Sequence, residues 1–153
     1  MIYLQIDEQL EVGEDPRLLS EALETAAHTT LQLATVESTV ELTIVLTDDV
    51  QIRQLNHQFS GLDAPTDVLS FPAGELDPDT EEMYLGDVVI SVPRAQAQAA
   101  AGGHPYLEEM QLLVVHGVLH LLGHDHGEPD EKQRMWALQR KALAELGCQI
   151  SPP

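Results

Sequence analysis

Apolar and polar residues alternate along two early segments of the chain, residues 2–6 and 40–46. A period of two places the apolar side chains on one side of an extended backbone, so each segment is predicted to be a β-strand. Residues 67–71 and 84–91 are rich in apolar and β-branched residues and predict two more short strands. The acidic residues 72–83 between them are expected to form a solvated connection.

Five other segments carry apolar residues three and four positions apart, which is the spacing of one helix face. Proline lies near the start of most of them and glycine follows several, as expected at helix boundaries. The predicted helices cover residues 16–33, 49–60, 93–101, 105–123 and 129–146. Strands and helices together predict an α+β fold, a single domain over residues 1–153 in which an approximately four-stranded mixed sheet packs with four or five helices.

The charge balance restricts the function. Seven Lys and Arg residues stand against 26 Asp and Glu residues, which gives a net charge of −19. A uniformly basic nucleic-acid-binding surface is excluded, and a polyanionic substrate would need a local positive site such as a bound metal ion. The single cysteine excludes a disulfide scaffold. With no signal peptide and no apolar stretch of about 20 residues, we expect a cytoplasmic protein with no membrane partner.

Four of the seven histidines lie within eleven residues, in the segment HGVLHLLGHDH. His116 and His120 are four residues apart on a predicted helix, so both imidazoles lie on one helix face, one turn apart. Gly123 allows the chain to leave the helix through a left-handed turn, after which His126 can reach the same ion. Three nitrogen ligands with an open fourth position are typical of catalytic zinc. We therefore predict one Zn²⁺ per chain, bound by these three histidines.

The spacing of these ligands resembles that of the metzincin peptidases, His-Glu-x-x-His-x-x-Gly-x-x-His, and predicts a zincin-like metal helix. Gly117 stands where those enzymes carry the glutamate that acts as general base, and glycine cannot accept a proton. The metal geometry is therefore expected without the peptidase chemistry. Either the metal acts without a carboxylate, or a carboxylate comes from elsewhere, with Asp125 and Glu128 as the local candidates.

The same histidine segment resembles the signature of the YbeY family of bacterial rRNA maturation endoribonucleases. Two further blocks extend the resemblance, LNHQFSGLDAPTDVLSFP at residues 55–72 and LGDVVIS at residues 85–91. The resemblance implies a zinc-dependent, single-strand-specific endoribonuclease of small-subunit rRNA processing and ribosome quality control, with His116, His120 and His126 as zinc ligands. It implies single-stranded ribosomal RNA as the substrate, and a ribosomal subunit or ribosomal proteins as further partners.

One position of the second block departs from the family pattern. Relatives usually carry an arginine just before the glycine equivalent to Gly61, an arginine thought to contact RNA, and this chain has Ser60 there. Arg53, the nearest base, lies seven residues earlier on roughly the same helix face. We treat it as a candidate catalytic residue, with a solvated surface charge as the alternative. Family position alone suggests that Thr66 and Asp67 line the metal cleft.

Two other functions are compatible with the sequence. A zincin-like hydrolase could act on another bond, such as a peptide or amide bond, although the glycine at position 117 argues against it. A ribosome-assembly factor without enzymatic activity could use zinc structurally, and the strong acidity and Ser60 favour that alternative. Metal-dependent cleavage of a single-stranded RNA distinguishes the nuclease from both.

Overall fold

Nine helices and strands make up the part of the chain that the computed structural model describes, residues 1–13, 15–36, 39–125 and 127–150. They are β1 (Ile2–Ile6), α1 (Pro16–Leu33), β2 (Val40–Thr47), α2 (Asp49–Ser60), β3 (Val68–Leu76), β4 (Met83–Ser91), α3 (Val92–Gly102), α4 (Tyr106–Leu121) and α5 (Pro129–Glu145). The strands form one sheet in the order β1-β2-β4-β3, in which β3 is antiparallel to β4 and the other pairs are parallel. The predicted α+β class, mixed four-stranded sheet and five helices are confirmed.

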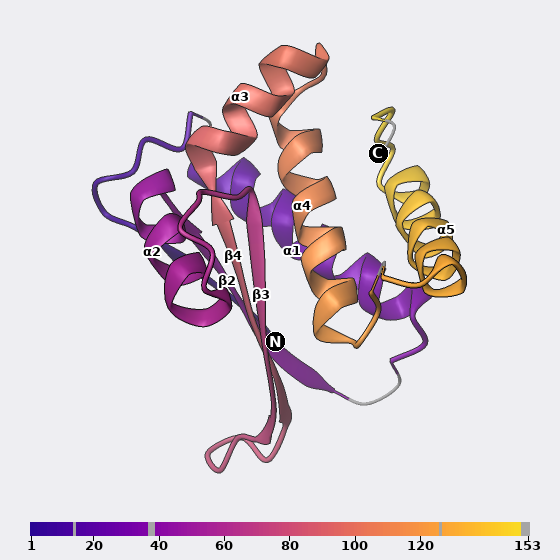
Figure 1. Ribbon diagram of the computed structural model, residues 1–153. Coiled ribbons are helices and arrows are strands. Elements are labelled where there is room, and N and C mark those ends of the chain that lie inside the picture. The colour runs from indigo at the N-terminus through magenta and orange to yellow at the C-terminus, as the bar shows by residue number, and fades with distance from the viewer. Residues whose placement is uncertain (14, 37–38, 126, 151–153) are drawn as a thin grey trace.

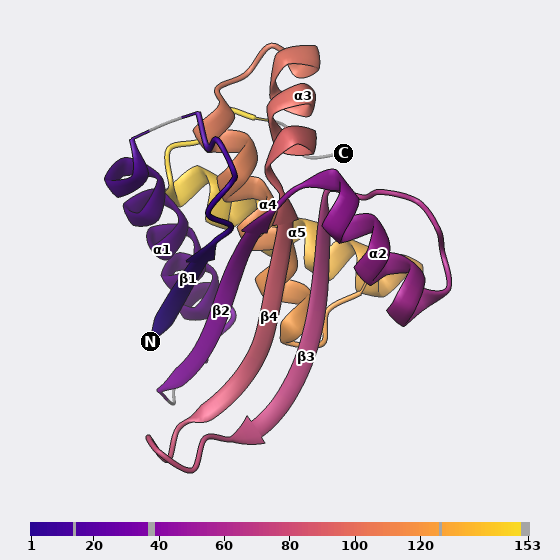
Figure 2. The same ribbon diagram turned by 90° about the vertical axis from the view of Figure 1, so that its left-hand side faces the viewer.

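The helices cover the two faces of the sheet unequally. On one side α4 packs against β3 and β4, α1 lies beside α4, and α5 packs on both of these helices (Figure 1). Figure 2 looks onto the opposite face, where α2 crosses in front of one end of the sheet. A ring contact between Phe59 of α2 and Phe71 of β3, with centroids 5.1 Å apart, joins α2 to the edge strand.

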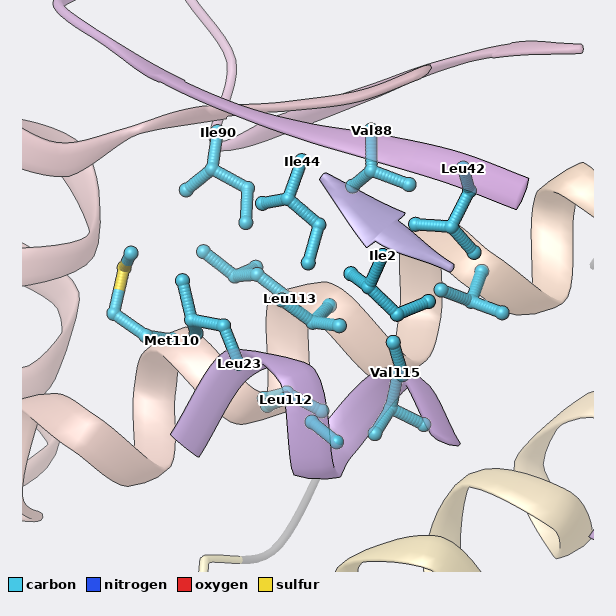
Figure 3. Close-up of a cluster of buried hydrophobic side chains, with 14 of the residues drawn as sticks. Ile2, Leu23, Leu42, Ile44, Val88, Ile90, Met110, Leu112, Leu113 and Val115 are labelled. Atoms are coloured by element: carbon cyan, nitrogen blue, oxygen red, sulfur yellow. The ribbon is translucent and has the colours of Figure 1, made fainter. Parts of the chain in front are cut away.

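The hydrophobic core lies between the sheet and the pair α1 and α4. Ile2, Leu42, Ile44, Val88 and Ile90 point from the strands toward Leu23 of α1 and Met110 and Leu113 of α4 (Figure 3). Because the sheet, α1 and α5 all pack on α4, this helix is apolar on most sides. A histidine on such a helix must have a polar partner or ligand to offset the cost of burial. None of the described helices is long and apolar enough to cross a membrane.

The predicted connection at residues 72–83 is largely exposed to solvent, but it is shorter than expected. β3 continues to Leu76 and β4 begins at Met83, and these two residues pair across a hairpin that projects from the sheet (Figure 1). Pro72 fits within β3 because an edge strand has one side free of backbone partners. Antiparallel pairing with β4 holds this segment in the strand, and a local sequence pattern does not reveal that pairing.

Candidate metal centre and its cleft

The two histidines of α4 converge on each other. The Nε2 atoms of His116 and His120 lie 3.1 Å apart, and both rings are half-buried. Two imidazoles that bind one tetrahedral zinc ion at about 2.0–2.1 Å place their nitrogens about 3.3 Å apart. The observed separation is therefore close to that of a ligand pair, and the residues fit a metal ion bound between these two nitrogens.

A buried amide orients the first of these rings. His116 donates a hydrogen bond from Nδ1 to Oε1 of Gln139 on α5, at 2.9 Å, and Gln139 is only 1% exposed. Because an amide oxygen can only accept, Nδ1 carries the proton and the Nε2 lone pair of His116 faces His120. Such a partner on the far nitrogen typically fixes the tautomer and direction of a metal-binding imidazole.

The third predicted ligand, His126, lies outside the described residues. Up to Asp125 the chain follows the predicted course, because Gly123 has a φ of +93° and the N–H groups of Gly123 and His124 donate to carbonyls in the last turn of α4. Within the described residues, no three His, Cys, Asp or Glu side chains are close enough together to hold a metal ion. The described part of the site is thus a pair of candidate ligands at the end of α4.

Gly117 is required by packing. A Cβ at this position would lie 2.5 Å from Cγ1 of Val88 and 3.3 Å from Oγ of Ser70. Ser70 also donates a hydrogen bond to the carbonyl oxygen of Gly117, at 2.9 Å, which holds α4 directly against β3. A glutamate at position 117, as in the metzincins, would separate the helix from the sheet.

A cleft of about 420 Å³ opens beside the histidine pair. The strand side is formed by the start of β3 and the residues just before it, and the helix side by the two imidazoles; the lining residues are Thr66, Asp67, Val68, Leu69, Ser70, Pro72, His116 and His120. Thr66 and Asp67, suggested by family position, therefore do line the cleft. Its wall is an edge strand, whose outer backbone groups can accept or donate hydrogen bonds to a ligand.

Asp67 is the carboxylate of this cleft. Its Oδ1 accepts hydrogen bonds from the backbone N–H of Val68, at 2.8 Å, and from the Thr66 hydroxyl, at 3.4 Å. The candidates Asp125 and Glu128 are exposed and do not line the cleft. Sequence reasoning placed Asp67 only by family position, because its approach to the histidines depends on the packing of β3 against α4.

Arg53 and Ser60 are engaged locally on α2. Arg53 donates to both carboxylate oxygens of Asp63, at 2.7 and 3.3 Å, and both side chains are more than half exposed. The guanidinium lowers the pKa of Asp63 through these hydrogen bonds and its charge. Ser60 donates to the carbonyl oxygen of Asn56 at 2.6 Å. Neither Arg53 nor Ser60 lines the described cleft.

Gln139 is the residue that sequence reasoning missed. It lies four residues after Met135, on the buried face of α5. The one available signal was a polar amide at a position where the apolar stripe of this helix predicts an apolar residue. A buried amide needs a partner, and the helix that follows the histidine segment is the natural place to look for one.

Comparisons with known proteins agree with this fold. A family model described as Endoribonuclease YbeY matches residues 5–147. A protein named Endoribonuclease YbeY from Geobacillus kaustophilus is 42% identical over 149 residues, covering 92% of this chain and 88% of its own. One of the same name from Persephonella marina is 48% identical over 113 residues, covering 73% and 74%. The solution structure of TM1509 from Thermotoga maritima superposes with a TM-score of 0.63 at 28% identity, covering 95% of this chain and 89% of that one.

Proposed function

The chain belongs to the endoribonuclease YbeY family and is an endoribonuclease, and we propose that it cleaves single-stranded ribosomal RNA in the cleft between β3 and α4. We further propose that a zinc ion held by His116, His120 and His126 serves this reaction, and that a ribosomal subunit or its proteins present the RNA. One observation carries the proposal: the two imidazoles of α4 converge to 3.1 Å at the wall of a 420 Å³ cleft.

The chain's own residues prepare the ligand set. Gln139 holds the proton of His116 on Nδ1, so that Nε2 carries a lone pair instead of a proton. This nitrogen faces Nε2 of His120. When bound, a zinc ion supplies Lewis acidity toward a phosphoryl oxygen, which stabilises charge that develops during phosphodiester cleavage. A positive ion also offers a polyanionic substrate a local attraction within a chain of net charge −19.

Asp67 is assigned the role of accepting the proton of the attacking hydroxyl group, which belongs to water or to the ribose. The oxygen of that group bonds to phosphorus as the bond from phosphorus to the leaving oxygen breaks, and the leaving oxygen takes a proton from solvent. Oδ1 is occupied by the Val68 amide and the Thr66 hydroxyl, which hold the carboxylate in place, while Oδ2 accepts no hydrogen bond from the described residues. This assignment replaces the missing glutamate at position 117 with a carboxylate from the opposite wall. A positioned general base contributes roughly 100- to 10,000-fold to such a reaction.

Variants of the histidines test the proposal. We expect purified protein to cleave a single-stranded RNA when zinc is present, and His120→Ala to lose this cleavage together with bound zinc. The control is His28→Ala, which removes an exposed imidazole from α1 and should change neither quantity. Equal cleavage by wild type and His120→Ala at equal purity would refute the assigned site.

A further inference from the structure

The basic residues of this acidic chain are concentrated on one helix. Four of the seven Lys and Arg residues lie on α5, and two of them, Lys132 and Arg140, are four residues before and four residues after Trp136, the single tryptophan. That spacing places the three side chains along one face of the helix. We call Lys132, Trp136 and Arg140 the α5 strip.

The two cations of the α5 strip face the solvent. Lys132 and Arg140 are exposed, Trp136 is half-buried, and neither cation forms an ion pair with any carboxylate that the structure describes. The ammonium of Lys132 lies over the indole, 5.7 Å from the ring centroid. With Gln133 and Ala137, the strip lines a shallow hollow of about 520 Å³.

Trp136 connects this hollow to the candidate metal centre. Its ring also lines a crevice of about 90 Å³, together with Asp67 and Val68 of the cleft wall, His116 and Gln139. The rings of Trp136 and His116 meet edge to face, with their centroids 6.1 Å apart. The cleft and the crevice share Asp67, Val68 and His116 as lining residues, and the crevice and the hollow share Trp136.

We propose that the α5 strip is a binding site for the nucleotides of the RNA strand next to the cleavage point, with a base stacked on Trp136 and phosphates held by Lys132 and Arg140. The inference rests on the proposed function, because it extends the same substrate beyond the cleft. An aromatic ring between two cations combines the two interactions by which proteins hold single-stranded nucleic acids, stacking and phosphate contact. In a chain with so few bases, two unpaired cations beside the cleft are the described residues best placed to contact phosphates.

The single tryptophan makes stacking directly measurable. We expect a single-stranded oligouridylate of about twelve nucleotides to quench the fluorescence of Trp136 in the zinc-loaded protein, recorded by stopped flow before cleavage proceeds. Trp136→Leu should weaken RNA affinity roughly five- to twenty-fold, and Trp136→Phe should retain most of it. Melting temperatures of both variants separate loss of stacking from loss of folding.

The two lysines of α5 provide the matched pair for the phosphate contacts. Lys132→Gln and Lys141→Gln each remove one positive charge from α5. Lys132 belongs to the α5 strip and Lys141 does not. Each phosphate contact contributes about 0.7 to the slope of log K against log salt concentration for a single strand, so Lys132→Gln should lower the slope by that amount and Lys141→Gln should not.

Unchanged Trp136 fluorescence at saturating RNA, or equal slopes for the two variants, would overturn the proposal. If the wild type cleaves RNA in that case, the failure concerns the strip alone, whereas a wild type that cleaves no RNA contradicts the proposed function itself.

Discussion

His116 and Gln139 are 23 residues apart in the sequence and joined by a 2.9 Å hydrogen bond, so a buried amide on α5 sets the tautomer of an imidazole on α4. We predict that Gln139→Met, which keeps the length of the side chain but removes the acceptor, lowers zinc affinity about 10- to 100-fold. Gln139→Glu restores an acceptor and should retain affinity. Competition with a fluorescent chelator measures both, and ¹⁵N NMR of the imidazoles reports the tautomer. Equal affinity of wild type and Gln139→Met would show that the hydrogen bond does not support the site.

The close approach of α4 to the sheet predicts a specific coupling between two residues. Gly117→Ala places a methyl group 2.5 Å from Cγ1 of Val88, so we expect overpacking to lower the free energy of unfolding by about 1–3 kcal/mol, more than alanine's helix propensity of about 1 kcal/mol restores. The double variant Gly117→Ala, Val88→Ala should have a higher free energy of unfolding than the sum of the two single changes predicts. Denaturant titration of all four proteins measures the coupling, and strict additivity would contradict the contact.

The two histidines that follow Gly123 should differ in their effect on metal binding. His126→Ala removes the third predicted ligand. We expect zinc affinity to fall more than about 100-fold, which exceeds the effect of removing a hydrogen-bond partner of a ligand. His124 lines a separate hollow with Asp125, Glu131 and Arg134, so His124→Ala should leave affinity within a few-fold. Calorimetric titration of zinc into both variants makes the comparison. Similar losses in the two variants would contradict the predicted ligand set.

Cys148 should be a poorly reactive thiol. Burial, with a smaller contribution from the charge of Glu108, raises its pKa from the ordinary value of 9.0 to about 11. At pH 8 the thiolate fraction, and with it the alkylation rate, should be roughly 100-fold lower in the folded than in the unfolded chain. Because the folded state holds this proton more tightly, the contribution to stability is fully present below pH 9 and decreases as the pH rises toward 11. Iodoacetamide kinetics with and without denaturant measure the difference; equal rates would contradict the burial.

The fold was largely predictable because its elements carry local signals. Apolar periodicity and the boundary residues of each helix depend on short stretches of sequence, and they located the helices and the parallel strands. The extent of β3 was not predictable in this way, because residues 72–76 contain Pro, Gly and Glu, show no apolar alternation, and are held in the strand by pairing with β4.

The candidate site likewise combines features that a local sequence pattern predicts with features that it does not. The ligand spacing of His116 and His120 is a property of one helix, and the sequence alone predicts it. The role of Gln139, the packing of Gly117 on Val88 and the approach of Asp67 to the histidines depend on contacts between elements distant in the sequence. No local pattern carries that information, and the local sequence offers only Asp125 and Glu128 as carboxylates near the histidines.

A zinc titration tests most directly whether a metal ion at the His116 and His120 pair serves RNA cleavage. Protein freed of metal by a chelator is titrated with zinc while the initial rate of single-stranded RNA cleavage and the bound zinc are both recorded. We predict that the rate rises in proportion to bound zinc, stops rising at one zinc per chain, and is absent at every zinc level in His116→Ala. Full cleavage by the metal-free protein, or an undiminished rate in His116→Ala, would contradict the account.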